Sequence, residues 1–154
     1  MEGYAFDARL TSVVPIGLVP DGLRVDVSFE GTVTEGPMTG GSLTGIDYLL
    51  FRRDGVGVVD VRMLVRLPGG GTAAVTARGY MIAPFEMPPL ETLAAPDFQW
   101  PDAETALHGC ATIQTMESAL AAANQTMYGF AGTTNPGRGD MRVRAHSLTS
   151  LPLA

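Results

Sequence analysis

Hydrophobic and polar residues alternate with a period of two along much of the chain, which is the pattern of half-buried β-strands. The clearest stretches are YAFDARLTSVV (residues 4–14), LRVDVSFEGTV (residues 23–33) and TAAVTARGYMI (residues 72–82). Glycine- and proline-containing turns separate the alternating stretches at short intervals. The pattern predicts an all-β protein of about six or more strands, arranged as an antiparallel barrel or a sandwich.

The C-terminal half of the chain interrupts this alternation. Residues 83–101 (APFEMPPLETLAAPDFQWP) are rich in proline and predict a long connection over the surface. Residues 102–124 are the only ones with helical composition, and because glycine and threonine interrupt them we expect one or two short helices there. QTMYGFAG (residues 125–132) and DMRVRAHSL (residues 140–148) predict two closing strands around the turn TTNPGRG.

The central stretch GIDYLLFRRDGVGVVDVRMLVRL predicts a hairpin that carries charged residues among apolar ones. Its Asp54-Gly55 dipeptide favours a two-residue type I′ turn, in which both positions have positive φ. In that register Asp47 lies directly opposite Arg62, and Asp60 shares their face. The opposite face is almost entirely apolar and holds Ile46, Tyr48, Leu50, Val59, Val61, Met63 and Val65.

The following hairpin extends both faces. An odd-numbered loop around Pro68–Thr72 places the next strand so that its apolar residues continue the apolar face; a slip of one residue would exchange the two faces. The other face, which we call the mixed face, then consists of Asp47, Asp60, Arg62, Thr76, Arg78 and Tyr80 together with Leu49, Phe51 and Leu64.

Two interpretations of the mixed face remain open from these residues. It can be an ordinary solvent face, on which an Asp47–Arg62 pair would contribute at most about 1 kcal/mol. It can instead line the interior of a barrel or a cleft, with the apolar face packed on another element or a second subunit. Leu49, Phe51 and Leu64 would be unusual on a plain solvent face.

A set of short motifs in this region resembles the bacterial domain of unknown function 3237 family. The motifs are Gly36-Pro37, Gly40, Gly45-Ile46-Asp47-Tyr48, Arg53 or Arg52 before Asp54-Gly55, and Asp60-Val61-Arg62. The family typically has tryptophan where this chain has Tyr48, and its aromatic-Leu-Asn motif near the C-terminus is matched only at Asn124. The similarity extends over roughly residues 23–148 and is poor over about 81–120.

The resemblance implies a lipocalin-like (calycin-like) antiparallel β-barrel that is often oligomeric, and it implies no particular reaction. A family pattern that places polar residues on these strands favours the interpretation in which the mixed face lines a cavity. We therefore expect Asp47, Asp60 and Arg62 to be catalytic residues. The expected substrate-contacting residues are Leu49, Phe51, Leu64, Thr76, Arg78, Tyr80 and Asn124.

Length, charge and cysteine content narrow the choice of partners. The 154 residues suffice for a single domain spanning 1–154, and the net charge of −6 argues against nucleic acid and anionic membranes as partners. No signal peptide is visible at the N-terminus, and the lone Cys110 cannot form an internal disulfide. We therefore expect a cytoplasmic protein.

The remaining chemistry points to carboxylates. His108 and His146 lie in unrelated segments without metal-ligand spacing, and GGGTAAV belongs to a hairpin turn rather than to a nucleotide-binding loop, so we expect no metal and no cofactor. Asp47 and Asp60 in unlike environments could divide the roles of general acid and base, with Arg62 or Arg78 holding an anionic group.

These observations predict a cofactor-independent acid/base enzyme, of isomerase, cyclase or lyase type, that acts on a small hydrophobic or aromatic metabolite. The alternative is a non-catalytic, lipocalin-like protein that binds such a molecule. If the mixed face is the interior, the apolar face points outward, and we expect part of it to be buried in a twofold homodimer. If the apolar row instead fills the barrel, Asp47, Asp60 and Arg62 revert to a solvated face and lose their expected catalytic roles.

Overall fold

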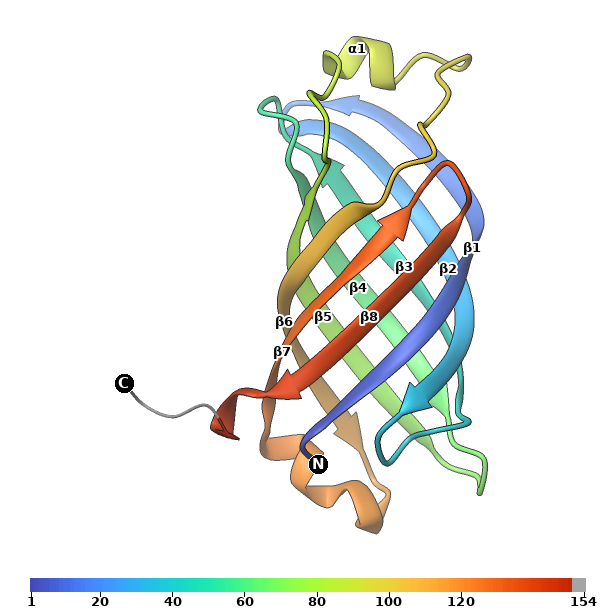
Figure 1. Cartoon of the computed structure of the whole chain (residues 1–154), viewed down its shortest axis with the longest axis vertical. Coiled ribbons are helices and arrows are strands. Elements are labelled where there is room, and N and C mark those ends of the chain that lie inside the picture. Colours follow the sequence, from blue (N-terminus) through green and yellow to red (C-terminus); the bar gives the residue numbers. More distant parts are fainter. Residues whose placement is uncertain (151–154) are drawn as a thin grey trace.

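The computed structural model describes residues 1–150 and forms a closed barrel in which eight antiparallel strands pair in chain order (Figure 1). The strands are β1 (Gly3–Val19), β2 (Gly22–Glu35), β3 (Ser42–Phe51), β4 (Gly57–Arg66), β5 (Thr72–Ile82), β6 (Thr105–Thr115), β7 (Met127–Asn135) and β8 (Asp140–Ser147). The short helices are α1 (Leu90–Leu93) and the 3-10 helices η1 (Ser118–Gln125) and η2 (Leu148–Ser150). The prediction of an all-β antiparallel barrel is confirmed. Within the described residues, no helix has the length and apolar character needed to cross a membrane.

The turn between β3 and β4 differs from the predicted one. The Arg52 N–H donates to the Val56 carbonyl at 2.9 Å and the Gly55 N–H donates to the Arg52 carbonyl at 2.9 Å, so three residues form the loop. Gly55 has a positive φ of 85°, whereas Asp54 does not. Asp54 instead accepts hydrogen bonds from the Arg52 guanidinium and the Val56 N–H, which stabilises a type I turn followed by a left-handed glycine.

This loop shifts the β3–β4 register by one residue from the predicted one. Asp47 lies opposite Val61, and Ile46 lies opposite Arg62. Asp47, Leu49 and Phe51 therefore point into the barrel with the apolar row of β4, because one residue of slip exchanges the two faces of a strand. The apolar row that was expected outside is inside, since Val59, Met63 and Val65 are buried.

The β4–β5 register agrees with the prediction. Asp60 pairs with Arg78, and Arg62 pairs with Thr76, across a loop with an odd number of residues. These side chains lie on the outer surface, as do Leu64 and Tyr80, which are 44% exposed. The prediction that these β4 and β5 side chains line the interior is wrong. In the observed register they share the outer face of the barrel with Ile46 and Tyr48 of β3, and not with Asp47. The buried row of β4 needs no second subunit to cover it, and the twofold homodimer stays a prediction.

Buried side chains pack the end of the barrel that lies at the bottom of Figure 1. The rings of Tyr4 and Tyr128 meet edge to face with centroids 5.7 Å apart, and Leu120 and Ala123 of η1 are buried against this end. Residues 105–115 of the segment with helical composition form strand β6, and helical structure begins only at Ser118.

The proline-rich segment between β5 and β6 crosses the other end of the barrel, above the strands in Figure 1. Leu90 and Leu93 of α1 are buried, and the Trp100 ring stacks on Phe51 with centroids 5.5 Å apart. The tip of the β3–β4 hairpin supports the segment, because a Cβ at Gly55 would lie 2.8 Å from Met87. We call residues 83–104 the lid.

Candidate functional site

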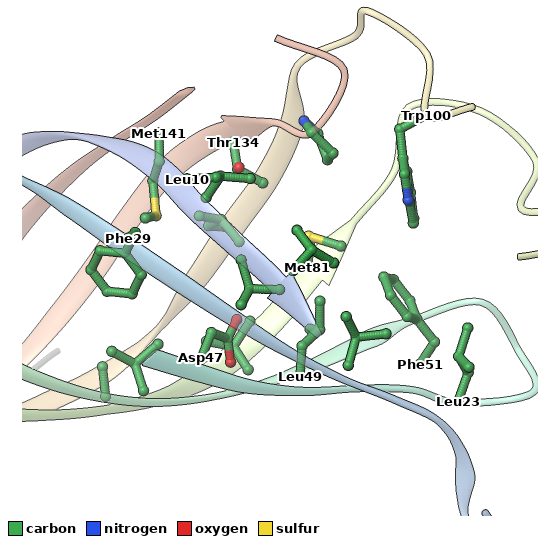
Figure 2. A pocket seen from close by; sticks show the side chains of 18 of the residues that line it. Leu10, Leu23, Phe29, Asp47, Leu49, Phe51, Met81, Trp100, Thr134 and Met141 are labelled. Atoms are coloured by element: carbon green, nitrogen blue, oxygen red, sulfur yellow. The ribbon is translucent and has the colours of Figure 1, made fainter. Parts of the chain in front are cut away.

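A cavity of about 480 Å³ occupies the barrel between the packed lower end and the lid. All eight strands and the lid contribute to its lining, which is almost entirely apolar. Figure 2 shows aliphatic, aromatic and methionine side chains directed into it from every side, among them Phe29, Leu49, Phe51, Met81, Trp100 and Met141. Its size and lining suit one small apolar molecule.

Asp47 carries the one ionisable carboxyl group among the described residues that line this cavity. Val27 of β2 and Val61 of β4 lie opposite it on the two neighbouring strands, and both also line the cavity. In Figure 2 the Asp47 carboxyl group projects among the apolar side chains near Leu49. The surface that this partly buried side chain keeps free therefore faces the cavity.

The barrel wall holds the Asp47 carboxyl group in place. The Asp60 N–H donates a hydrogen bond of 3.0 Å to Oδ1 of Asp47. Asp60 lies between two pairs of the β3–β4 ladder, which are Asp47 with Val61 and Leu50 with Val58. The carboxyl oxygen of Asp47 therefore accepts a hydrogen bond from the backbone within the ladder itself. The hydrogen bond ties the acid to strand backbone, which is more rigid than a loop.

Burial among apolar side chains raises the pKa of Asp47 from its ordinary value of 3.8 to about 6. The hydrogen bond from the Asp60 backbone opposes this shift, while the charge of the Asp60 carboxylate adds to it. Smaller effects come from Arg24, which lowers the pKa, and Asp26, which raises it. A carboxyl group with a pKa near 6 is populated in both protonation states close to neutral pH and can transfer protons in either direction.

The other predicted site residues divide sharply. Leu49 and Phe51 line the cavity with Asp47. On the outer wall, Asp60 lies 2.8 Å from the Arg62 guanidinium and 3.6 Å from that of Arg78.

The remaining members of the predicted set lie outside as well. Thr76 and Leu64 are on the outer wall, and the Tyr80 ring lies beside His108 with centroids 6.0 Å apart. Asn124 is below the barrel in η1, where its amide group exchanges two hydrogen bonds of 2.9 Å with the backbone of Thr115. Its role is to fasten η1 to β6.

Several cavity residues were not identified from the sequence. Phe98 and Trp100 come from the lid, which has no periodic pattern to show which side chains point inward. Thr134 of β7 supplies a hydroxyl group to the lining, and it donates a hydrogen bond to the Asp140 carbonyl at 3.2 Å. Phe29 had a usable signal, because it alternates in phase with Val25 and Val27, and both of these line the cavity.

The cavity opens beside the distal half of β1. Pairing between β1 and β8 ends at Arg9 and Asp140, so β1 extends well beyond its neighbour. Val13 lines the cavity and is nevertheless 58% exposed, which places it at the mouth. Ile16 and Leu18, further along the same strand, are also exposed.

Among residues 1–150, no group of three His, Cys, Asp or Glu side chains is placed to hold a metal ion. The lining instead offers one carboxyl group, a few neutral polar groups and a large apolar surface. Such an arrangement can bind an apolar molecule and exchange a proton with it.

Comparison with solved structures finds the same barrel in several proteins. A protein of unknown function from Clostridium acetobutylicum matches with a TM-score of 0.76 and 18% identity, over 96% of this chain and 94% of its own. A protein of unknown function from Rhodopseudomonas palustris matches with a TM-score of 0.74 and 15% identity, over 95% and 94% of the two chains. An enzyme from Penicillium herquei matches with a TM-score of 0.56 and 15% identity, over 95% and 96%.

At these identities the likeness shows a shared fold. No family model matches the chain, and no curated protein matches it. The resemblance to the domain of unknown function 3237 family therefore stays a prediction. The class that fold and site define is a closed eight-stranded antiparallel β-barrel with an internal cavity.

Proposed function

We propose that this protein is a cofactor-independent acid/base enzyme, of isomerase, cyclase or lyase type, that acts on a small hydrophobic or aromatic molecule inside the barrel. The observation that carries the proposal is a single carboxyl group, Asp47, with a pKa of about 6 in an otherwise apolar cavity of about 480 Å³. Groups with perturbed pKa values in such cavities are frequent at catalytic sites. Asp60 and Arg62 have no part in the proposed chemistry, because they lie on the outer wall.

In the proposed mechanism Asp47 moves a proton between two atoms of one substrate. Ionised Asp47 removes a proton from a carbon next to a carbonyl group, and the resulting carboxylic acid returns the proton to another atom of the same molecule. The alternative order, donation first and removal second, needs only the protonated form at the start. No electrons are exchanged with a second reactant, and the lid and apolar walls limit access of water to the intermediate.

The likeness to the Penicillium herquei enzyme supports this proposal only through the fold, which can host catalysis.

The alternative is a protein that binds an apolar molecule without converting it. The scarcity of polar groups in the cavity favours this alternative, because Tyr4 and Thr134 supply the only side-chain oxygen atoms besides those of Asp47 among the described lining residues.

One experiment separates the two functions. The protein is incubated with a metabolite extract, and both the retained and the converted compounds are identified by mass spectrometry. The enzyme proposal predicts conversion that Asp47→Asn abolishes and that Asp60→Asn, the matched change on the outer wall, leaves within a few fold. Retention of a compound without conversion would support the binding protein instead.

A further inference from the structure

The charges around Asp47 are arranged so that none of them reaches into the cavity. On β2, Arg24 and Asp26 form an ion pair of 3.0 Å on the outer surface. On β4, Arg62 and Asp60 form the outer ion pair already described. The lid residues that line the cavity are Leu93, Ala94, Ala95, Pro96, Phe98 and Trp100, all uncharged.

This arrangement discriminates between ligands by charge. A carboxylate or phosphate group bound in the cavity would find no cation among the described lining residues and would lie near another acid. An unpaired ion in an apolar site is strongly unfavourable. An uncharged ligand meets apolar walls and incurs no such cost.

An uncharged ligand also changes the surroundings of Asp47 itself. Val13 lines the cavity and is exposed, so the empty cavity is open to solvent, and water that reaches Asp47 would solvate its ionised carboxylate. A ligand that fills the cavity displaces this water and leaves the Asp60 N–H as the hydrogen bond that the wall supplies. The neutral form of the acid is then favoured, because loss of water penalises the charged form.

We propose that the cavity selects uncharged apolar ligands over anionic ones, and that Asp47 takes up a proton when such a ligand fills the cavity. This inference rests on the same cavity as the proposed function and specifies the charge of its substrate. Of the two orders of proton transfer described above, the inference selects donation first and removal second. A proton-accepting group of the ligand, such as a carbonyl, ether or alkene, would then be placed against Asp47.

A matched series of fluorescent probes tests the charge selection. The probes are 9-anthracenemethanol, 9-(aminomethyl)anthracene and anthracene-9-carboxylate, which share one ring system and carry neutral, cationic and anionic groups. Fluorescence titration at pH 7.5 is expected to show that the alcohol binds at least about 100-fold more tightly than the carboxylate. Binding of the two within about tenfold of each other would overturn the charge selection.

Calorimetry tests the proton uptake. Binding of the alcohol is measured at pH 7 in two buffers with different ionisation enthalpies, which gives the number of protons taken up. The wild-type protein is expected to take up as much as about one proton, since most of Asp47 is ionised before binding. Asp47→Asn keeps the shape of the side chain and should still bind the alcohol with no uptake, whereas Asp60→Asn should retain the uptake.

The outcomes are distinct from those of the catalytic proposal. Proton uptake without conversion of any substrate would refute the proposed enzyme function and support the proton uptake by Asp47. Asp47-dependent conversion without proton uptake would support the enzyme function and refute the proton uptake. Tighter binding of the amine than of the alcohol would identify a cation site and overturn the inference. If no anthracene probe binds, the corresponding naphthalene compounds are used, and their failure to bind would refute the ligand cavity itself.

Discussion

Asp47 and Asp60 lie on neighbouring strands and are joined by one hydrogen bond, yet they occupy opposite sides of the barrel wall. Asp47 faces the cavity between two valines, and burial raises its pKa to about 6. Asp60 faces solvent between two arginines, at 2.8 and 3.6 Å. The same type of side chain is thus a buried carboxyl group with a raised pKa on one face and a member of a surface ion-pair cluster on the other. The position of each residue along its strand decides which face its side chain occupies.

The sharpest contrast between the two acids should appear in turnover. On the substrate that the metabolite-extract experiment identifies, Asp47→Asn should lower kcat/KM by roughly 10²- to 10⁴-fold, the usual contribution of a general acid or base. Asp60→Asn should change it by less than about threefold, because its carboxyl group is outside the cavity. Equal losses in the two variants would mean that the wall does not separate their roles.

Packing provides a second contrast between the faces. Leu43→Ala, at a side chain 1% exposed, should lower the free energy of unfolding by about 2–5 kcal/mol because it leaves a cavity in the filled lower end. Leu64→Ala, at a side chain 44% exposed, should cost less than about 1 kcal/mol. Urea denaturation measures both, and a reversed order would place β3 and β4 inside out.

The pH dependence of stability distinguishes the acids without any ligand. Because the pKa of Asp47 is about 6 in the folded protein against an ordinary value of 3.8, the folded state holds a proton that the unfolded state releases. Stability should therefore fall as pH rises from about 4 to about 6, with a total loss of up to about 3 kcal/mol. In urea denaturation at several pH values, Asp47→Asn should remove this component and Asp60→Asn should retain it.

The smallest expected effect belongs to the outer ion pairs. Arg62→Ala removes the 2.8 Å contact with Asp60, but both side chains are exposed to solvent. The loss of unfolding free energy should be less than about 1 kcal/mol and should shrink further at high salt. A loss of several kcal/mol would show that the pair is structural rather than superficial.

Much of the fold could be predicted because alternation is a direct consequence of a barrel with an apolar interior. Strand β5 has the predicted bounds of residues 72–82, and the β4–β5 register follows from matching the apolar faces. Strand β6 was missed because its buried positions include small residues such as Ala111, which weaken the alternation of large apolar and polar side chains and favour a helix.

The site could be predicted only in part, because it depends on one turn. An Asp-Gly pair is compatible with both a two-residue and a three-residue loop, and the hydrogen bonds of Asp54 decide between them. Asp47, Leu49 and Phe51 were correctly grouped on one face, but the residues opposite them were displaced by one. The lid was beyond reach, since Trp100 finds Phe51 through tertiary packing rather than through a local pattern.

A titration of the Asp47 carboxyl group by NMR shows directly whether this group lies in the cavity with a raised pKa. The protein is labelled with ¹³C at the aspartate carboxyl carbons, and the Asp47 signal is assigned by its loss in Asp47→Asn. The structure predicts a titration midpoint of about pH 6, with a further rise when 9-anthracenemethanol is added. A midpoint near the ordinary value of 3.8 that the ligand leaves unmoved would place Asp47 in solvent rather than in the cavity.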